Sequence, residues 1–333
     1  MVAMRRIRAA LWTVVCVLLW MVVAGCGRTE GSVLNDLRNL RDSLKHYRSV
    51  AVMNVKTQGL EQVYHIETWY QAPSYYRIQL ADSRGQVQQV VIRNDQGIYI
   101  VSPPLKKSFR FNGDWADNQG HLYLFGSVID RILQSPSRTY TREKGTVTFD
   151  LTMKPDNPLI GKQRVILDDR TLYPKQIAFF DRQGRELVTV QFQQFDPGAT
   201  FKSSDFDPQQ ALALGPKDEP TWASGPFGVI EPTWLPQGWS RTEVQDSGGT
   251  VILRYRGGAE GLTLTEAHPI RTETALPGRA ELWDLFGVPA VVTEGNVRTM
   301  YWTRDGVQFA MTGSLPPEDM ARIAISTFEA SGK

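Results

Sequence analysis

The sequence has few of the residues from which metal centres and disulfides are built. It contains two cysteines and four histidines among 333 residues. The histidines (His46, His65, His121 and His268) are scattered and lack a ligand spacing such as H-E-x-x-H. Of the cysteines, only Cys26 would remain after removal of a signal sequence, so no disulfide could form within the mature chain. The sequence therefore predicts no metal site and no cofactor, and its stability has to come from a packed core.

Motifs that carry catalysis are also missing. Gly126-Ser127 lacks the second glycine of a G-x-S-x-G nucleophile elbow, and no P-loop or dinucleotide-binding glycine pattern occurs. Asp168-Asp169 places two carboxylates side by side, but neighbouring residues of a strand point to opposite faces, so we interpret them as turn formers. We expect a protein that is not an enzyme. A cell-wall enzyme stays open as a hypothesis, without a visible nucleophile or metal set.

An excess of charge of either sign is absent. Residues 1–25 hold three of the 37 basic residues and none of the 35 acidic ones, which leaves a formal charge of −1 on residues 26–333. A nucleic-acid-binding protein would be expected to show a strongly basic face. The short basic cluster of Lys106-Lys107 with Arg110 is interpreted as a solvated hairpin end. No nucleic-acid partner is predicted.

The one long apolar run lies at the N-terminus. It extends from Ala9 to Val23 behind three arginines, and polar sequence begins at Gly27, whereas a stable membrane span needs about 20 apolar residues. This pattern is typical of a secretory signal. The run ends in Val-Ala-Gly-Cys, which resembles a bacterial lipobox, in which the cysteine (here Cys26) receives a diacylglyceryl group. The alternative is an ordinary signal peptide followed by an incidental cysteine.

The lipobox predicts where the protein resides. We expect residues 1–25 to be a signal peptide, Cys26 to be the lipid attachment site and residues 26–35 to form a flexible lipidated tether. Two or more acyl chains anchor a protein stably in a membrane. The protein would therefore be held at the extracytoplasmic face of the cell membrane by its N-terminal lipid.

The mature chain begins with a helical pattern and continues with strands. Apolar residues recur every three or four positions from Val33 to Tyr47, as on one face of an amphipathic helix. From Val50 to Phe195 the period changes to two, for example at Val147, Phe149 and Leu151. Such alternation is typical of antiparallel strands with one buried face. We expect about ten strands in this region.

One apolar segment within the strands has helical spacing. Residues 121–133 form this predicted helix, which has to lie against a sheet face and could either fill the curve of the sheet or cover a cavity. Aromatic residues are frequent between Trp69 and Phe125, so an apolar pocket for an acyl chain or an apolar peptide is one interpretation and a packed core is the other. The candidate cavity-lining residues are Trp69, Tyr76, Ile78, Leu80, Leu122, Phe125, Ile129 and Leu133.

A proline-rich stretch at residues 203–227 is predicted to be a linker between residues 36–202 and a smaller α+β domain at residues 228–333. Six short strands are expected in this last domain, at 243–246, 251–256, 262–266, 288–293, 298–302 and 308–312. A helix should follow from about Pro317, with a buried face made of Met320, Ile323, Ala324, Thr327 and Phe328.

Several short motifs resemble the LolA/LolB-like lipoprotein carrier superfamily. They are an aromatic strand before Ala72-Pro73, then Tyr76-Arg77-Ile78, then Asp95-Gln96-Gly97-Ile98-Tyr99, and Asp168 to Pro174 in a later hairpin. The C-terminal region resembles a small domain found in lipoproteins of spore-forming Gram-positive bacteria. In plan the chain is most similar to sporulation and germination lipoproteins. The resemblance implies a mainly β (α+β) fold, a curved antiparallel half-barrel with a covering helix, plus a smaller α+β C-terminal domain.

One position departs from the carriers. They hold an arginine before the proline that matches Pro73, where it ties their lid helix to the sheet, and this chain has Ala72 there. A regulated transport cycle is therefore not expected. Two hypotheses follow: a non-catalytic binding lipoprotein that acts through a protein partner in cell-envelope, sporulation or germination processes, or a carrier or sensor that binds lipid or lipoprotein acyl chains in the half-barrel.

Overall fold

The computed structural model describes residues 28–57, 60–115, 123–153, 159–215, 228–268, 273–304 and 306–328. The predicted signal sequence, Cys26 and Leu122 lie outside these residues. None of the described helices combines the length and the apolar character needed to cross a bilayer.

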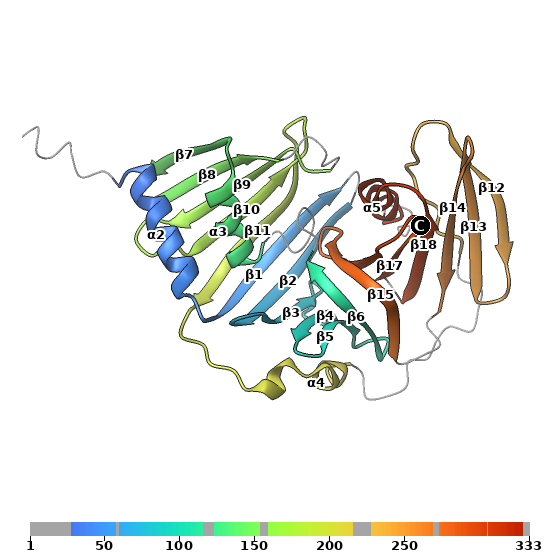
Figure 1. Cartoon of the computed structure of the whole chain (residues 1–333), viewed down its shortest axis with the longest axis horizontal. Helices are drawn as coiled ribbons and strands as arrows, with labels where there is room; N and C mark the ends of the chain where they lie inside the picture. Colours follow the sequence, from blue (N-terminus) through green and yellow to red (C-terminus); the bar gives the residue numbers. More distant parts are fainter. Residues whose placement is uncertain are drawn as a thin grey trace, which may run out of the picture.

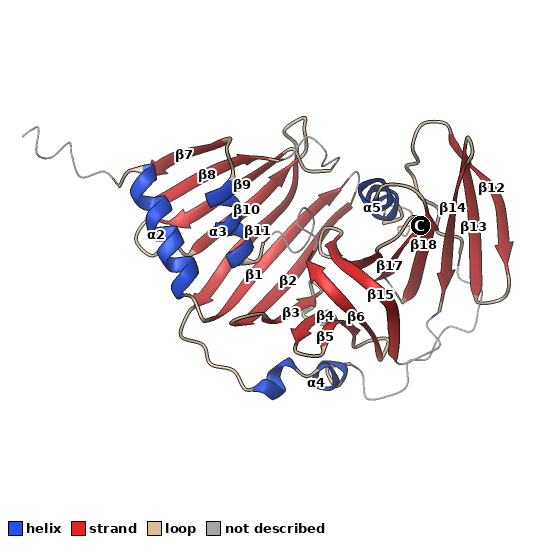
Figure 2. Ribbon diagram, viewed as in Figure 1, coloured by secondary structure: helices blue, strands red, loops and turns tan. Residues whose placement is uncertain are grey.

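The first part of the chain folds into an open, curved antiparallel sheet, as predicted (Figures 1 and 2). Its order is β6-β5-β4-β3-β2-β1-β11-β10-β9-β8-β7. The strands are β1 (His46–Thr57), β2 (Leu60–Gln71), β3 (Tyr75–Ala81), β4 (Val87–Asn94), β5 (Gly97–Ser102), β6 (Lys107–Trp115), β7 (Arg138–Glu143), β8 (Thr146–Thr152), β9 (Lys162–Asp168), β10 (Pro174–Phe180) and β11 (Glu186–Asp196).

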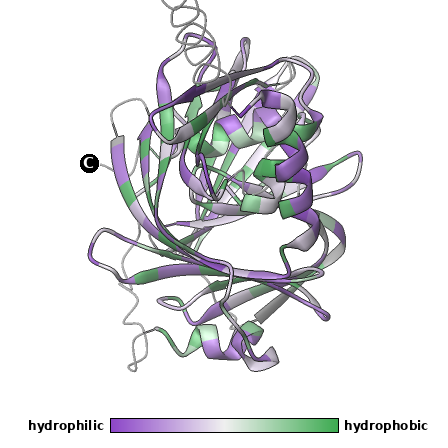
Figure 3. Ribbon diagram, turned by 90° about the vertical axis from the view of Figure 1, so that its left-hand side faces the viewer, coloured by the Kyte–Doolittle hydropathy of each residue, from purple (hydrophilic) through white to green (hydrophobic). Residues whose placement is uncertain are grey.

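Two helices occupy the concave side of this sheet. They are α2 (Glu30–Ser43) and α3 (Phe125–Gln134), and the end-on view of Figure 3 shows the sheet curving around them. Helix α2 begins earlier than the predicted tether allows, because the Thr29 side chain accepts the backbone N–H of Ser32 and caps its first turn. It also ends before Tyr47, which lies in β1.

The C-terminal part is a smaller α+β unit with its own apolar core. Its strands are β12 (Trp239–Asp246), β13 (Thr250–Gly257), β14 (Glu260–Ala267), β15 (Glu273–Asp284), β16 (Pro289–Thr293), β17 (Arg298–Arg304) and β18 (Val307–Gly313). Helix α5 (Pro317–Ser326) follows, and the five residues predicted for its buried face are all buried. Strand β15 is the only one of these strands that the sequence pattern did not predict.

Strand β15 joins the two parts into one sheet. It pairs in parallel with β6, the strand at the end of the half-barrel, and antiparallel with β16. The result is a continuous 18-stranded sheet whose edges, among the described strands, are β7 and β12. Packing also crosses the junction, because Leu276, Ala280 and Leu282 of β15 belong to the core of the half-barrel.

The first half of the predicted linker is folded. Residues Ser203–Phe206 form a 3-10 turn and Pro208–Leu212 form helix α4, which lies against the convex face of the sheet (Figure 1). Phe206 and Ala211 are buried there beside Val90 and Ile92 of β4. Proline therefore starts a short helix here and does not mark an extended chain.

The junction between β6 and β15 depends on a close approach of two backbones. An added Cβ at Gly113 of β6 would overlap the carbonyl oxygen of Ala280 in β15. Overpacking of this kind costs about 1–3 kcal/mol. We expect Gly113→Ala to lower the midpoint of urea unfolding and to accelerate hydrogen exchange in both strands. Gly228→Ala is the matched control, because a Cβ there meets nothing within 4 Å; an equal loss of stability in both variants would contradict this role.

Candidate functional site

The concave face of the half-barrel is filled by side chains of the described residues. Val128, Ile129 and Ile132 of α3 are 0% exposed, and Phe125 is 1% exposed. They pack against the buried faces of the surrounding strands in a single cluster. Of the two predicted alternatives, the structure supports the filled curve over the open cavity for this part of the chain.

Aromatic rings account for much of this filling. Tyr47 of β1 stacks on Phe195 of β11 with ring centroids 5.0 Å apart, and Phe125 of α3 packs edge-on to Phe195 at 4.9 Å. Tyr70 and Tyr76 continue the row at 4.8 Å. Burial raises the pKa of the Tyr47 and Tyr76 hydroxyls, as expected where water is excluded. The rings contact one another and hold α3 in place.

Most of the predicted lining residues lie on this face. Ile78, Leu80, Phe125 and Ile129 are members of the buried cluster, and Tyr76 and Leu133 pack against it. Trp69 does not lie there. It follows Thr68 and precedes Tyr70 in β2, so strand alternation turns it to the convex face, where it stacks on Phe201 at 5.4 Å. Aromatic content alone did not reveal this face, whereas the alternation with Tyr70 would have.

Helix α3 is tied to α2 by an ion pair. The Arg41 guanidinium of α2 donates to both carboxylate oxygens of Asp130 at 3.0–3.2 Å, and this interaction raises the pKa of Arg41. Ala72, at the position of the carriers' arginine, packs against the buried cluster. The Arg41–Asp130 ion pair thus joins α3 to α2 and not to the sheet.

Two hollows lie where the half-barrel meets the C-terminal part. The first, which we call the polar hollow, has a volume of about 510 Å³ and is lined by Gln62, Tyr64, Gln88 and Arg84 from the half-barrel and by Thr303 and Arg304 from β17. The buried Gln89 amide nitrogen donates to the Thr303 carbonyl oxygen at 2.7 Å and holds the two sides together. The two sides of this hollow come from segments more than 180 residues apart in the chain, so no local sequence pattern could have predicted it.

The second hollow, of about 470 Å³, lies beside helix α5. The Arg322 guanidinium lies 3.9 Å from the Trp234 ring centroid on one side, and Lys56 pairs with Glu186 at 3.4 Å on the other. Both hollows are lined by acidic and basic side chains. Among the described residues no three His, Cys, Asp or Glu side chains converge as they would around a metal ion.

Comparison with known proteins identifies the family. The profile of the family described as "Sporulation protein YdcC-like" matches residues 6–206, which is more than half of the chain. The chain belongs to the YdcC-like sporulation protein family. The match covers the half-barrel and its covering helices, and it confirms the predicted resemblance to sporulation proteins.

A curated relative extends the similarity beyond the half-barrel. The sporulation protein YdcC of Bacillus subtilis is 26% identical over 324 residues, covering 94% of this chain and 95% of the relative. The aligned length therefore includes the C-terminal part. Family membership places this chain among sporulation proteins.

Solved structures with a similar fold are more distant in sequence. The Pseudomonas aeruginosa MucA/MucB complex has a chain that is 17% identical with a TM-score of 0.34, covering 89% of this chain and 98% of that one. A chain of the GerS lipoprotein–CwlD amidase complex of Clostridioides difficile is 16% identical with a TM-score of 0.31. The match covers 52% of this chain and 96% of that one. A LolA superfamily protein from Nitrosomonas europaea is 9% identical with a TM-score of 0.31. The match covers 54% of this chain and 97% of that one.

Among the described residues, the C-terminal part contains two buried carboxyl groups, Asp284 of β15 and Glu266. Glu266 of β14 points inward in line with Leu262 and Leu264, is fully buried, and accepts the backbone N–H of Ile230 with both oxygens at 3.1 and 3.2 Å. Burial raises its pKa from 4.5 to about 7, partly offset by that N–H. Glu266 thus holds the segment that enters the C-terminal part after residue 227.

If side-chain packing fills the concave face, truncation there should be costly. We expect Ile129→Ala to lower the free energy of unfolding by about 2–5 kcal/mol, because it removes a fully buried side chain and leaves a cavity. Leu133→Ala, at a partly buried position of the same helix, should cost less. Breaking the ion pair with Arg41→Ala should cost no more than about 1 kcal/mol. Urea denaturation measures all three, and a tolerated Ile129→Ala would contradict the filled interior.

The raised pKa of Glu266 predicts a pH-dependent stability. The unfolded chain releases this proton at lower pH than the folded protein, so the stabilisation is present below about pH 4.5 and is lost as the pH rises through about 7. Glu266→Gln keeps an acceptor for Ile230 and cannot ionise. The variant should exceed the wild type in melting temperature by an amount that grows as the pH rises from about 4.5 to about 7 and levels off above that pH. Glu260→Gln, an exposed control in β14, should leave the pH dependence unchanged.

Proposed function

We propose that this protein is a lipid-anchored, extracytoplasmic and non-catalytic binding lipoprotein that acts through a protein partner during sporulation. The observation that carries the proposal is the filled concave face: Val128, Ile129 and Ile132 have no exposed surface. A carrier of acyl chains needs apolar space that the ligand can enter. Here the protein's own side chains take that place, which leaves the outer surface for binding.

The family and the sequence support the remaining parts of this proposal. Membership in the YdcC-like family supports the role in sporulation. The lipobox-like sequence ending in Cys26 supports the lipid anchor and an extracytoplasmic position.

We place the partner at the polar hollow. It is bordered by both parts of the molecule, and ligand sites are frequent at such junctions. Its amide, hydroxyl and guanidinium groups can pair with a polar protein surface, and Tyr64 adds an aromatic ring of the kind enriched at interfaces.

A photoreactive amino acid can locate the partner in sporulating cells. Arg84 lines the polar hollow, is exposed, and makes no side-chain ion pair among the described residues. We expect a probe at Arg84 to form a protein adduct and a probe at Gln210, exposed on α4 at the convex side, to form none. The adduct is detected by its mass on denaturing gels and identified by mass spectrometry.

Two results would contradict the proposal. The first is the absence of any protein adduct above background at Arg84. The second is a lipid that remains bound to the Cys26→Ser variant in native mass spectrometry, which would favour the acyl-chain carrier hypothesis.

A further inference from the structure

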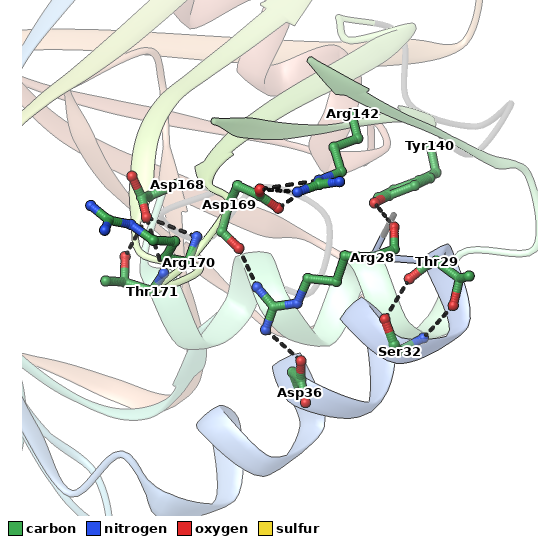
Figure 4. Close-up of polar contacts among 10 residues, drawn as sticks. All are labelled: Arg28, Thr29, Ser32, Asp36, Tyr140, Arg142, Asp168, Asp169, Arg170 and Thr171. Atoms are coloured by element: carbon green, nitrogen blue, oxygen red, sulfur yellow. Dashed lines mark hydrogen bonds and ion pairs between the residues drawn. The ribbon is translucent and has the colours of Figure 1, made fainter. Parts of the chain in front are cut away.

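The first described residues are fastened to one end of the half-barrel. The Arg28 guanidinium donates to the Asp169 carbonyl oxygen and pairs with the Asp36 carboxylate of α2 (Figure 4). The Tyr140 hydroxyl of β7 donates to the Arg28 carbonyl oxygen at 2.9 Å. Residue 28 is therefore held both by its side chain and by its backbone.

Neighbouring ion pairs fix the same corner. Arg138 of β7 bonds Glu30 in the first turn of α2 at 2.9 Å, and Arg142 donates to both carboxylate oxygens of Asp169. The pairing with Arg142 lowers the pKa of Asp169, so this carboxylate stays ionised. Helix α2, strand β7 and the turn after β9 thus form one bonded unit around Arg28.

The distance from this unit to the predicted anchor is short. Only Gly27 separates Arg28 from Cys26, and two extended residues span at most about 7 Å. A flexible tether of ten residues would instead give a mean reach of about 17 Å. A lipid on Cys26 would therefore hold this end of the half-barrel directly against the headgroups.

The outward charges of this end suit an anionic surface. Its carboxylates Asp36, Asp168, Asp169 and Glu30 are each paired with an arginine or lysine. Two neighbouring turns carry one basic residue each, Lys144 and Arg170. The Asp169 N–H donates to the Gly145 carbonyl oxygen and joins these turns. Both basic side chains are exposed and have no ion pair among the described residues. Glu143 is the remaining exposed carboxylate of these turns. Lys and Arg near a membrane are attracted to anionic lipids.

The C-terminal part lies at the opposite end of the molecule. Figure 1 places the start of α2 and the turns beside it at the left of the long axis, and β12 and β13 at the right. The turn between β12 and β13, which contains Ser247, is therefore far from the corner that holds Arg28.

We propose that the bonded unit around Arg28 is a membrane-docking surface, which sets the half-barrel on an anionic bilayer and directs the C-terminal part away from it. This inference rests on the proposed lipidation of Cys26. It adds an orientation to that proposal, because a lipid on a long tether would allow any orientation.

Site-specific quenching measures this orientation. Lipoprotein extracted from cells would carry either Thr141→Cys, at an exposed site near the docking surface, or Ser247→Cys, each labelled with a thiol-reactive fluorophore. Both substitutions leave every charge at the docking surface in place. After reconstitution in phosphatidylglycerol vesicles containing a nitroxide-headgroup lipid, we expect quenching at position 141 to exceed that at position 247 several-fold. A Gly-Ser insertion between Gly27 and Arg28 should abolish the difference, and Arg28→Ala should reduce it.

The outcomes separate the two proposals. Wild-type protein that takes up the fluorophore at Cys26 has a free thiol there, which would overturn the lipidation and this inference with it. Wild-type protein that takes up no fluorophore is consistent with a lipid on Cys26. In that case, equal quenching at positions 141 and 247 would overturn only the docking surface. A difference that is unchanged after the insertion would do the same. An unequal quenching that vanishes with the insertion supports it.

Discussion

The parallel pairing of β6 with β15 is the contact on which the architecture depends. Without it, β6 would be an open edge of the half-barrel, with unpaired backbone groups and a template for aggregation. With it, the sheet continues into the C-terminal part, and Leu276, Ala280 and Leu282 enter the core of the half-barrel. The walls of both hollows at the junction come from the two parts that this pairing joins.

The sequence predicted the periodic elements well and this junction not at all. Alternation revealed the half-barrel strands, and helical spacing revealed α3 and α5, because each pattern records burial against a local face. Strand β15 contains Leu276-Pro277-Gly278 and shifts register between Ala275 and Arg279, so its alternation is broken. Its partner strand lies more than 150 residues earlier in the chain. The local sequence pattern around β15 therefore cannot predict this pairing.

The candidate site was predicted only in part, because spacing reveals which residues share a face but not how the space beside that face is filled. Ile78, Leu80, Phe125 and Ile129 could be assigned to one buried face from their spacing, whereas Trp69 was assigned by its chemistry and lies on the other. Periodicity could not distinguish a filled curve from a cavity, because both require the same apolar positions. What decides between them is side-chain volume, and here Tyr47 stacks on Phe195 while Phe125 packs edge-on to the same ring.

We infer that the filled interior and the continuous sheet together stiffen the molecule. Side chains packed at interior density resist deformation, and the backbone ladder runs from β7, beside Arg28, to β12 at the far end. With a lipid two residues from Arg28, such a molecule would act as a spacer, holding a partner bound at the junction at a fixed height above the membrane. A carrier, in contrast, has to open and close, and the packing around α3 opposes that motion.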